Sequence, residues 1–127
     1  MANKFKGEFD ITLDGKTYTM RPTFEAMVDF EDKAGSVVNW AKLMGEQTPP
    51  SIKAIVAAIW AGIKHGHPVD GRPPSFSEVG AMVMRDGAMK HAPTFVNFLA
   101  KAMSLDGDIA QAQQDAAAGK AEGAATT

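Results

Sequence analysis

The segment from Ser51 to His65 constrains the fold more than any other part of the sequence. Its large apolar residues recur at helical spacing, and they are Ile52, Ile55, Val56, Ile59, Trp60 and Ile63. The opposite side of the same helix carries small residues instead of charged ones, namely Ala54, Ala57, Ala58, Ala61 and Gly62. A helix without a polar face needs cover on both sides. We therefore expect this helix at the centre of the domain.

A β-hairpin is predicted near the start of the chain, over residues 8–21. Apolar and polar residues alternate on both sides of Asp14-Gly15, a dipeptide typical of two-residue hairpin turns. An isolated hairpin is only marginally stable in water, so its apolar face needs a cover. The central helix can provide it, and the residues expected to meet are Ile55, Ile59 and Ile63 with Phe9, Ile11 and Tyr18.

Helix caps and apolar spacing predict four more short helices. With the central helix, the predicted ranges are about 24–34, 37–44, 51–65, 76–86 and 93–104. Ser75 to Glu78 matches a capping box, and Pro93 opens the last helix because proline is not tolerated in a helix interior. The residues expected to face inward are Phe24, Met27, Val28, Phe30, Ala34, Val79, Val83, Met84, Phe95, Phe98, Leu99 and Ala102. Glu31 falls within the first apolar arc, which suggests a cationic partner or the edge of a contact surface.

The predicted fold class is mainly α (α+β), with the N-terminal hairpin packed on a bundle of about five short helices. Residues 1–105 are expected to form a single globular domain. Residues 106–127 are rich in Ala and Gln, and Ile109 is their only large apolar residue. Such a segment buries too little to offset the entropy of ordering, so we expect a disordered tail that is dispensable for folding.

Composition excludes several classes of function. The 127 residues include no cysteine, which removes disulfides and thiolate chemistry, and 13 Lys+Arg against 15 Asp+Glu argue against a nucleic-acid binder. The first residues lack the apolar stretch of a signal peptide, so a cytoplasmic location is expected. The longest apolar run, from Ala54 to Ile63, spans ten residues, whereas a membrane helix needs about 20. No membrane span is predicted.

Catalytic and metal motifs are not evident in the sequence. Metal ligation would require His65, His67 and Asp70 to act together, and their spacing matches a zinc site poorly. A histidine at a helix end also interacts favourably with the helix dipole, and we prefer that interpretation. We predict no catalytic residues, no cofactor and no metal. A small metal-dependent enzyme that uses His65 and His67 is kept as a further hypothesis, because histidines at a helix end can be ligands.

Methionine is the unusual feature of the composition, with eight in 127 residues. It commonly fills gaps in cores, and it is also frequent on surfaces that adapt to varied apolar partners. Met82, Met89 and Met103 fall off the predicted core faces. Together with Trp40, they are the predicted partner-binding residues.

The pattern of the chain resembles the small tail assembly chaperones of tailed phages and gene transfer agents. The similarity covers roughly residues 1–104 and consists of many individually weak positions. They are Met1-Ala2-Asn3, Gly7-Glu8, Leu13-Asp14-Gly15-Lys16, Arg21-Pro22-Thr23-Phe24-Glu25-Ala26-Met27, Glu31, Gly35-Ser36-Val37, the Ile/Ala helix ending near Gly62 to Gly66, Val79-Gly80 and Gly87. Trp40, Trp60 and the long tail depart from the family pattern.

The resemblance implies a non-virion protein that binds the long helical tape measure protein. It would keep that protein soluble until tail tube subunits polymerise around it. In some phage systems a ribosomal frameshift extends such chaperones to recruit the tail tube protein, a second expected partner. Self-association stays open. The alternative is a structural tail tube or connector component of a phage-like particle, although those folds are mostly β-rich.

Overall fold

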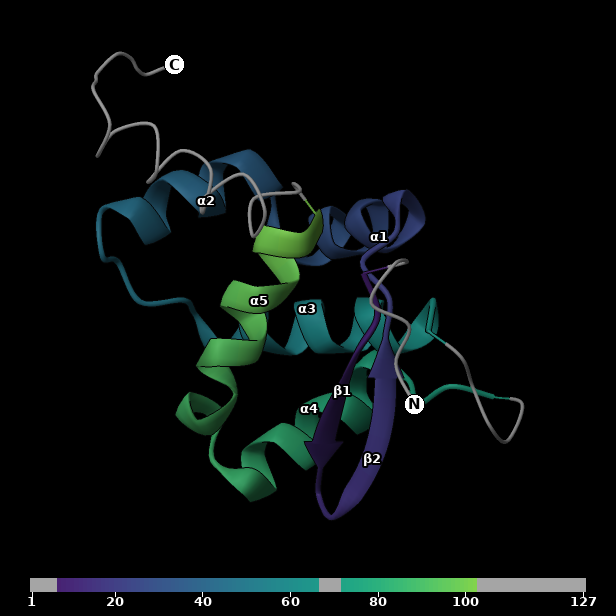
Figure 1. Cartoon of the computed structure of the whole chain (residues 1–127). Coiled ribbons are helices and arrows are strands. Elements are labelled where there is room, and N and C mark those ends of the chain that lie inside the picture. The colour runs from purple at the N-terminus through teal and green to yellow at the C-terminus, as the bar shows by residue number, and fades with distance from the viewer. Residues whose placement is uncertain (1–6, 67–71, 103–127) are drawn as a thin grey trace, which may run out of the picture.

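The computed structural model describes residues 7–66 and 72–102, and these form a mainly helical α+β fold with an N-terminal hairpin (Figure 1). The elements are β1 (Phe9–Leu13), β2 (Lys16–Met20), α1 (Phe24–Ala34), α2 (Val37–Gly45), α3 (Ile52–Lys64), α4 (Phe76–Asp86), the short 3₁₀ helix η2 (Ala88–His91) and α5 (Ala92–Ala102). The predicted fold class is confirmed. The predicted tail, residues 106–127, lies outside the described residues.

The hairpin has the predicted turn. β1 and β2 are antiparallel, with Phe9 opposite Met20 and Ile11 opposite Tyr18. Asp14 and Gly15 both have positive φ, 53° and 81°, as a type I′ turn requires. This register places the apolar side chains of both strands on one face of the ribbon.

The helix α3 occupies the centre of the fold, as its sequence predicts. Every residue from Ala54 to Ile63 is buried except the half-buried Trp60. This helix contacts α1, α4, α5, η2 and β2, and in Figure 1 it crosses the middle of the molecule between α1 and α4. Its small residues allow these neighbours to approach closely.

The hairpin packs on α3 through β2 and the residue that follows it. The backbone N–H of Arg21 donates to the carbonyl of Gly62 over 3.0 Å. A Cβ added at Gly62 would lie 2.5 Å from the Cε atom and 3.0 Å from the Cβ atom of Met20, so a side chain here would require Met20 to shift. Ile11, Leu13 and Met20 are buried here, whereas Phe9 and Tyr18 are only half-buried at the edge. The hairpin therefore packs on α3 through β2, while the expected pairing of Ile55, Ile59 and Ile63 with Phe9, Ile11 and Tyr18 stays a prediction.

Two predicted core faces are wrong in detail. In α1 the buried residues are Ala26 and Phe30, while Phe24 is 77% exposed and Val28 is 42% exposed. Residues two apart on a helix point about 200° apart, so packing through Ala26 turns Phe24 outward. In α3, Ile52 is half exposed in the first turn, before the helix reaches its neighbours.

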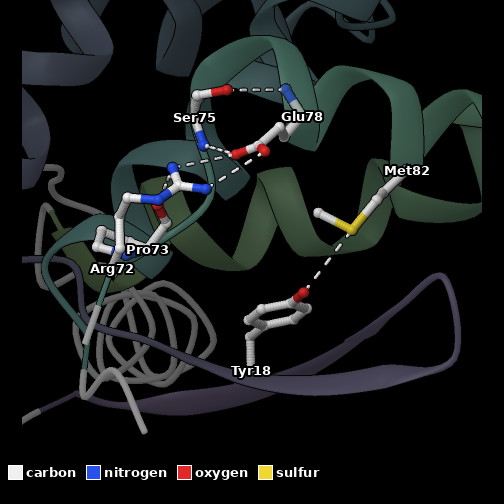
Figure 2. A network of polar contacts seen from close by, with 6 residues as sticks. All are labelled: Tyr18, Arg72, Pro73, Ser75, Glu78 and Met82. Carbon is white, nitrogen blue, oxygen red and sulfur yellow. Dashed lines mark hydrogen bonds and ion pairs between the residues drawn. The ribbon is translucent and has the colours of Figure 1, made fainter. Parts of the chain in front are cut away.

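In α4 too, the buried face differs from the predicted one. Met84 was expected to face inward, yet it is 57% exposed, whereas Met82 is buried at 9%. Met82 is covered because α4 contacts the hairpin as well as α3, and the hydroxyl of Tyr18 donates to its sulfur over 3.7 Å (Figure 2). Val79 and Val83 are buried as predicted.

The last helical region completes the core. Phe95, Phe98 and Leu99 are buried as expected, and the ring of Phe30 lies 6.1 Å from Phe95 and 5.8 Å from Phe98. The side chain of Ala102 lies outside the described residues. Residues 88–91, just before the predicted start of this helix, form η2, which is continuous with α5.

The predicted capping box at the start of α4 is confirmed. Glu78 accepts from the backbone N–H of Ser75, and the hydroxyl of Ser75 accepts from the backbone N–H of Glu78 (Figure 2). The hydrogen bond from Ser75 and the nearby Arg72 lower the pKa of Glu78.

Among residues 7–66 and 72–102, no helix is long and apolar enough to cross a membrane.

Candidate partner-binding surface

The structure places three of the four predicted partner-binding residues, Trp40, Met82 and Met89, and it does not leave all three exposed. Met89 is 62% exposed on η2, as expected, and Met103 lies outside the described residues. The expectation that Met82 lies off the core is wrong, because this side chain is buried against Tyr18. Whether Met89 binds a partner stays a prediction.

Trp40 has a structural role that limits its availability. Its ring packs edge-on against Phe95 with 5.5 Å between centroids. Its indole N–H donates to the carbonyl of Ala34 over 2.8 Å. The side chain is half-buried and links α2 to α5 and to the end of α1. A partner could reach only its outer edge.

Other large apolar side chains are exposed on the helices of the described part of the chain. They are Phe24, Val28, Val38, Ile52, Met84, Met89 and Val96. Single exposed apolar residues are common on soluble proteins, so most of these positions carry little information. Phe24 and Val28 differ, because they lie one turn apart on the same face of α1.

The pair is bordered by carboxylates. Counting about 100° per residue, Glu25 and Asp32 lie on one side of the Phe24–Val28 line, and Glu31 lies on the other. All three acidic residues are exposed. We call this set, Phe24, Val28, Glu25, Glu31 and Asp32, the α1 outer face. Sequence reasoning missed it because Phe24 and Val28 fit an inward arc equally well.

The structure gives Glu31 a role that the sequence did not suggest. Its Oε2 atom accepts from the backbone N–H of Val37 over 2.8 Å, at the start of α2. Ser36 caps the same helix by accepting from the N–H of Asn39. Two of the N–H groups that a helix start leaves without partners are therefore satisfied. In the described part of the chain, Glu31 is in no ion pair with a cation.

His65 is engaged with α1. Its Nε2 atom lies 2.6 Å from Oδ2 of Asp29, and Lys64 lies 3.1 Å from the same oxygen. Partial burial raises the pKa of Asp29, but the hydrogen bonds from His65 and Lys64 outweigh this effect, so its pKa lies below the usual value. His67 and Asp70 lie outside the described residues. Among those that are described, no group of three or more acidic, histidine or cysteine side chains could hold a metal ion.

A cluster of lysines and aromatic rings lies beside this ion pair. The Nζ atom of Lys33 is 4.9 Å from the ring of Phe76, and that of Lys64 is 5.2 Å from the ring of Trp60. Trp60 and Phe76 pack edge to face at 5.7 Å. Cations over aromatic rings add modest stability at exposed sites. The cluster joins α1, α3 and the start of α4.

A second histidine lies beside the contact between the hairpin turn and the end of α4, where the histidine and the turn both bind the carboxylate of Asp86. The buried His91 lies 2.7 Å from Oδ2 of Asp86, and this oxygen also accepts from the backbone N–H of Asp14 over 3.0 Å. Arg85 pairs with the carboxylate of Asp14. The hydrogen bond from the Asp14 backbone, and then that from His91, lower the pKa of Asp86. These contacts hold the hairpin turn against α4, and this structural role accounts for His91, Asp86 and Asp14.

Comparisons with known proteins found no relative of this chain. No protein-family model matches the chain, and searches of curated proteins and of solved structures found no match.

Proposed function

We propose that this chain is a tail assembly chaperone of the phage type, a binding protein and not an enzyme. In this proposal it binds the tape measure protein and keeps it soluble until the tail tube polymerises around it. The observation that carries the proposal is the exposure of three large apolar side chains on helices, Phe24 at 77%, Val28 at 42% and Met89 at 62%. A surface of this kind suits an elongated client that offers many apolar positions.

The small size of these apolar contacts also supports a chaperone. Phe24 and Val28 lie on α1, and Met89 lies on η2. Small separate contacts give modest affinity at each point, which allows a polymerising tube to displace the chaperone. The mainly helical fold supports this proposal over a tube subunit, for which a β-rich fold would be expected. The tail tube protein remains a proposed second partner.

Co-expression with the tape measure protein of the same gene cluster tests the proposal. Affinity-tagged chain should retain the tape measure protein in a pull-down, and an unrelated acidic helical protein of similar size should not. Met89→Gln should weaken retention without changing the circular dichroism spectrum. Absence of the tape measure protein from the pull-down of soluble, folded chain would contradict the proposal.

A further inference from the structure

We propose that the α1 outer face is a docking site for a basic amphipathic helix, which lays apolar side chains on Phe24 and Val28 and lysines or arginines against the carboxylates. This inference deepens the proposed function by naming the site and the chemistry of the client segment. The docking chemistry can also be tested without the tape measure protein.

The apolar part of the site is unusually exposed for its position. Phe24 is the first residue of α1, its side chain is 77% exposed, and Val28 follows one turn later at 42%. The opposite side of the same helix packs on α3 through Ala26 and Phe30. Aromatic side chains, phenylalanine included, are enriched in the cores of protein interfaces. The pair can contact two turns of a partner helix.

Asp32 has no structural explanation in the described fold, whereas Glu25 suits the first turn of α1 and Glu31 accepts from the N–H of Val37. Within residues 7–66 and 72–102, Glu25 and Asp32 make no ion pair. Asp32 also lies in the last turn of α1, where the helix dipole disfavours an anion. A residue that breaks a local rule without a visible gain is a candidate for function.

Charge complementarity selects a basic partner. The outer face has three carboxylates and no cationic side chain along α1, because Lys33 points to Trp60 and Phe76. A second copy of this chain is disfavoured, because a two-fold contact would place the same acidic groups against each other. The segment 106–127 is disfavoured as well, since it carries four acidic residues and one basic residue.

A labelled synthetic peptide tests the site directly. The probe has about three heptads of Leu and Lys with Leu on one face, and the control peptide has Glu in place of Lys. Fluorescence anisotropy with the full chain should show binding of the Lys peptide only. Raising the salt concentration from about 50 mM to about 500 mM should weaken it, because screening shortens the reach of the carboxylates.

Paired variants assign the binding to the α1 outer face. The double variant Phe24→Gln with Val28→Gln should lower the affinity for the Lys peptide by about tenfold, because the peptide loses its apolar contacts. The control replaces Met84 and Val96 with Gln, which removes two exposed apolar side chains from other helices. It should change the affinity by less than about twofold. Equal loss in both variants would overturn the assignment.

A second pair of variants separates local charge from net charge. Glu25→Gln with Asp32→Asn should lower the affinity by about threefold at low salt and reduce the salt dependence. Asp10→Asn with Glu46→Gln removes the same number of charges elsewhere and should have little effect. If both pairs weaken binding equally, the peptide responds only to net charge and the proposal fails.

Other occupants of the face give distinct results. Deletion of residues 2–6, which include Lys4, Phe5 and Lys6, tests whether the N-terminal segment covers the face. Tighter peptide binding after this deletion would overturn the choice of an external partner. A concentration-dependent dimer that Phe24→Gln with Val28→Gln abolishes would point to a second copy instead. Peptide binding without retention of the tape measure protein would refute the proposed function alone, and the reverse would refute only this docking site.

Discussion

Ile59 tests the residue-level account of the core. It is fully buried in α3, whereas Ile52 in the same helix is half exposed. Ile59→Ala should lower the free energy of unfolding by about 2–5 kcal/mol, because it removes buried methylenes and leaves a cavity. Ile52→Ala should change it by no more than about 0.5 kcal/mol. Urea unfolding measures both, and a loss below about 1 kcal/mol for Ile59→Ala would show that the residue is not core.

Asp29 makes stability depend on acid pH. Its pKa is lower in the folded chain, mainly because the hydrogen bonds from His65 and Lys64 outweigh partial burial. Its contribution is therefore complete above the ordinary carboxyl pKa of about 4 and is lost as the pH falls through the folded value. Urea unfolding of wild type should show stability falling from about pH 5 downward, and Asp29→Asn should show a shallower fall. Identical slopes would contradict this role.

At the scale of elements, the contact between α3 and β2 depends on Gly62. Gly62→Ala would place a Cβ 3.0 Å from Cβ of Met20, so β2 would have to shift by a few tenths of an ångström. Despite the better helix propensity of alanine, this variant should lose about 1–3 kcal/mol of stability. Gly80→Ala in α4 is the matched control, because its nearest neighbour would be Val56 at 3.7 Å. It should gain up to about 1 kcal/mol in the same thermal or urea unfolding assay.

Elements were predictable from the sequence where the signal is local. The Asp14-Gly15 turn and the capping box at Ser75 fix backbone geometry within a few residues, so the predicted hairpin over 8–21 and the predicted helix over 76–86 agree with the structure. The orientation of α1 and α4 was not predictable in the same way. Each helix has two adjacent apolar arcs, and the choice between them depends on which side reaches α3 and the hairpin. That is a tertiary property.

The candidate surface was also predictable in part, where local sequence decides exposure, and not where distant contacts decide it. Met89 follows Gly87, the residue that ends α4, and its exposure agrees with prediction. Met82 was misassigned because its cover comes from Tyr18, which is 64 positions distant in sequence. The α1 outer face was missed because Phe24 counts as a core residue by type. Only the packing of Ala26 on the other side shows that it faces outward.

At the scale of the whole molecule, one central helix organises the fold and leaves the outer faces of its neighbours free. The hairpin, α1, α4 and α5 all contact α3, so each of these elements packs one apolar face against the same core. The remaining apolar side chains lie on the outside of the helices, where they do not contribute to the shared core. If the exposed side chains bind a partner as we propose, this arrangement separates stability from binding. Surface variants can therefore test binding in a folded protein.

The soluble fraction of the tape measure protein measures the central claim most directly. It should be determined by centrifugation of lysates that contain the tape measure protein alone, with the wild-type chain, or with the Phe24→Gln, Val28→Gln variant. We predict that the wild-type chain moves the tape measure protein from the pellet to the supernatant, and that the variant does so poorly while remaining soluble itself. A tape measure protein that stays in the pellet beside abundant folded wild-type chain would contradict the account.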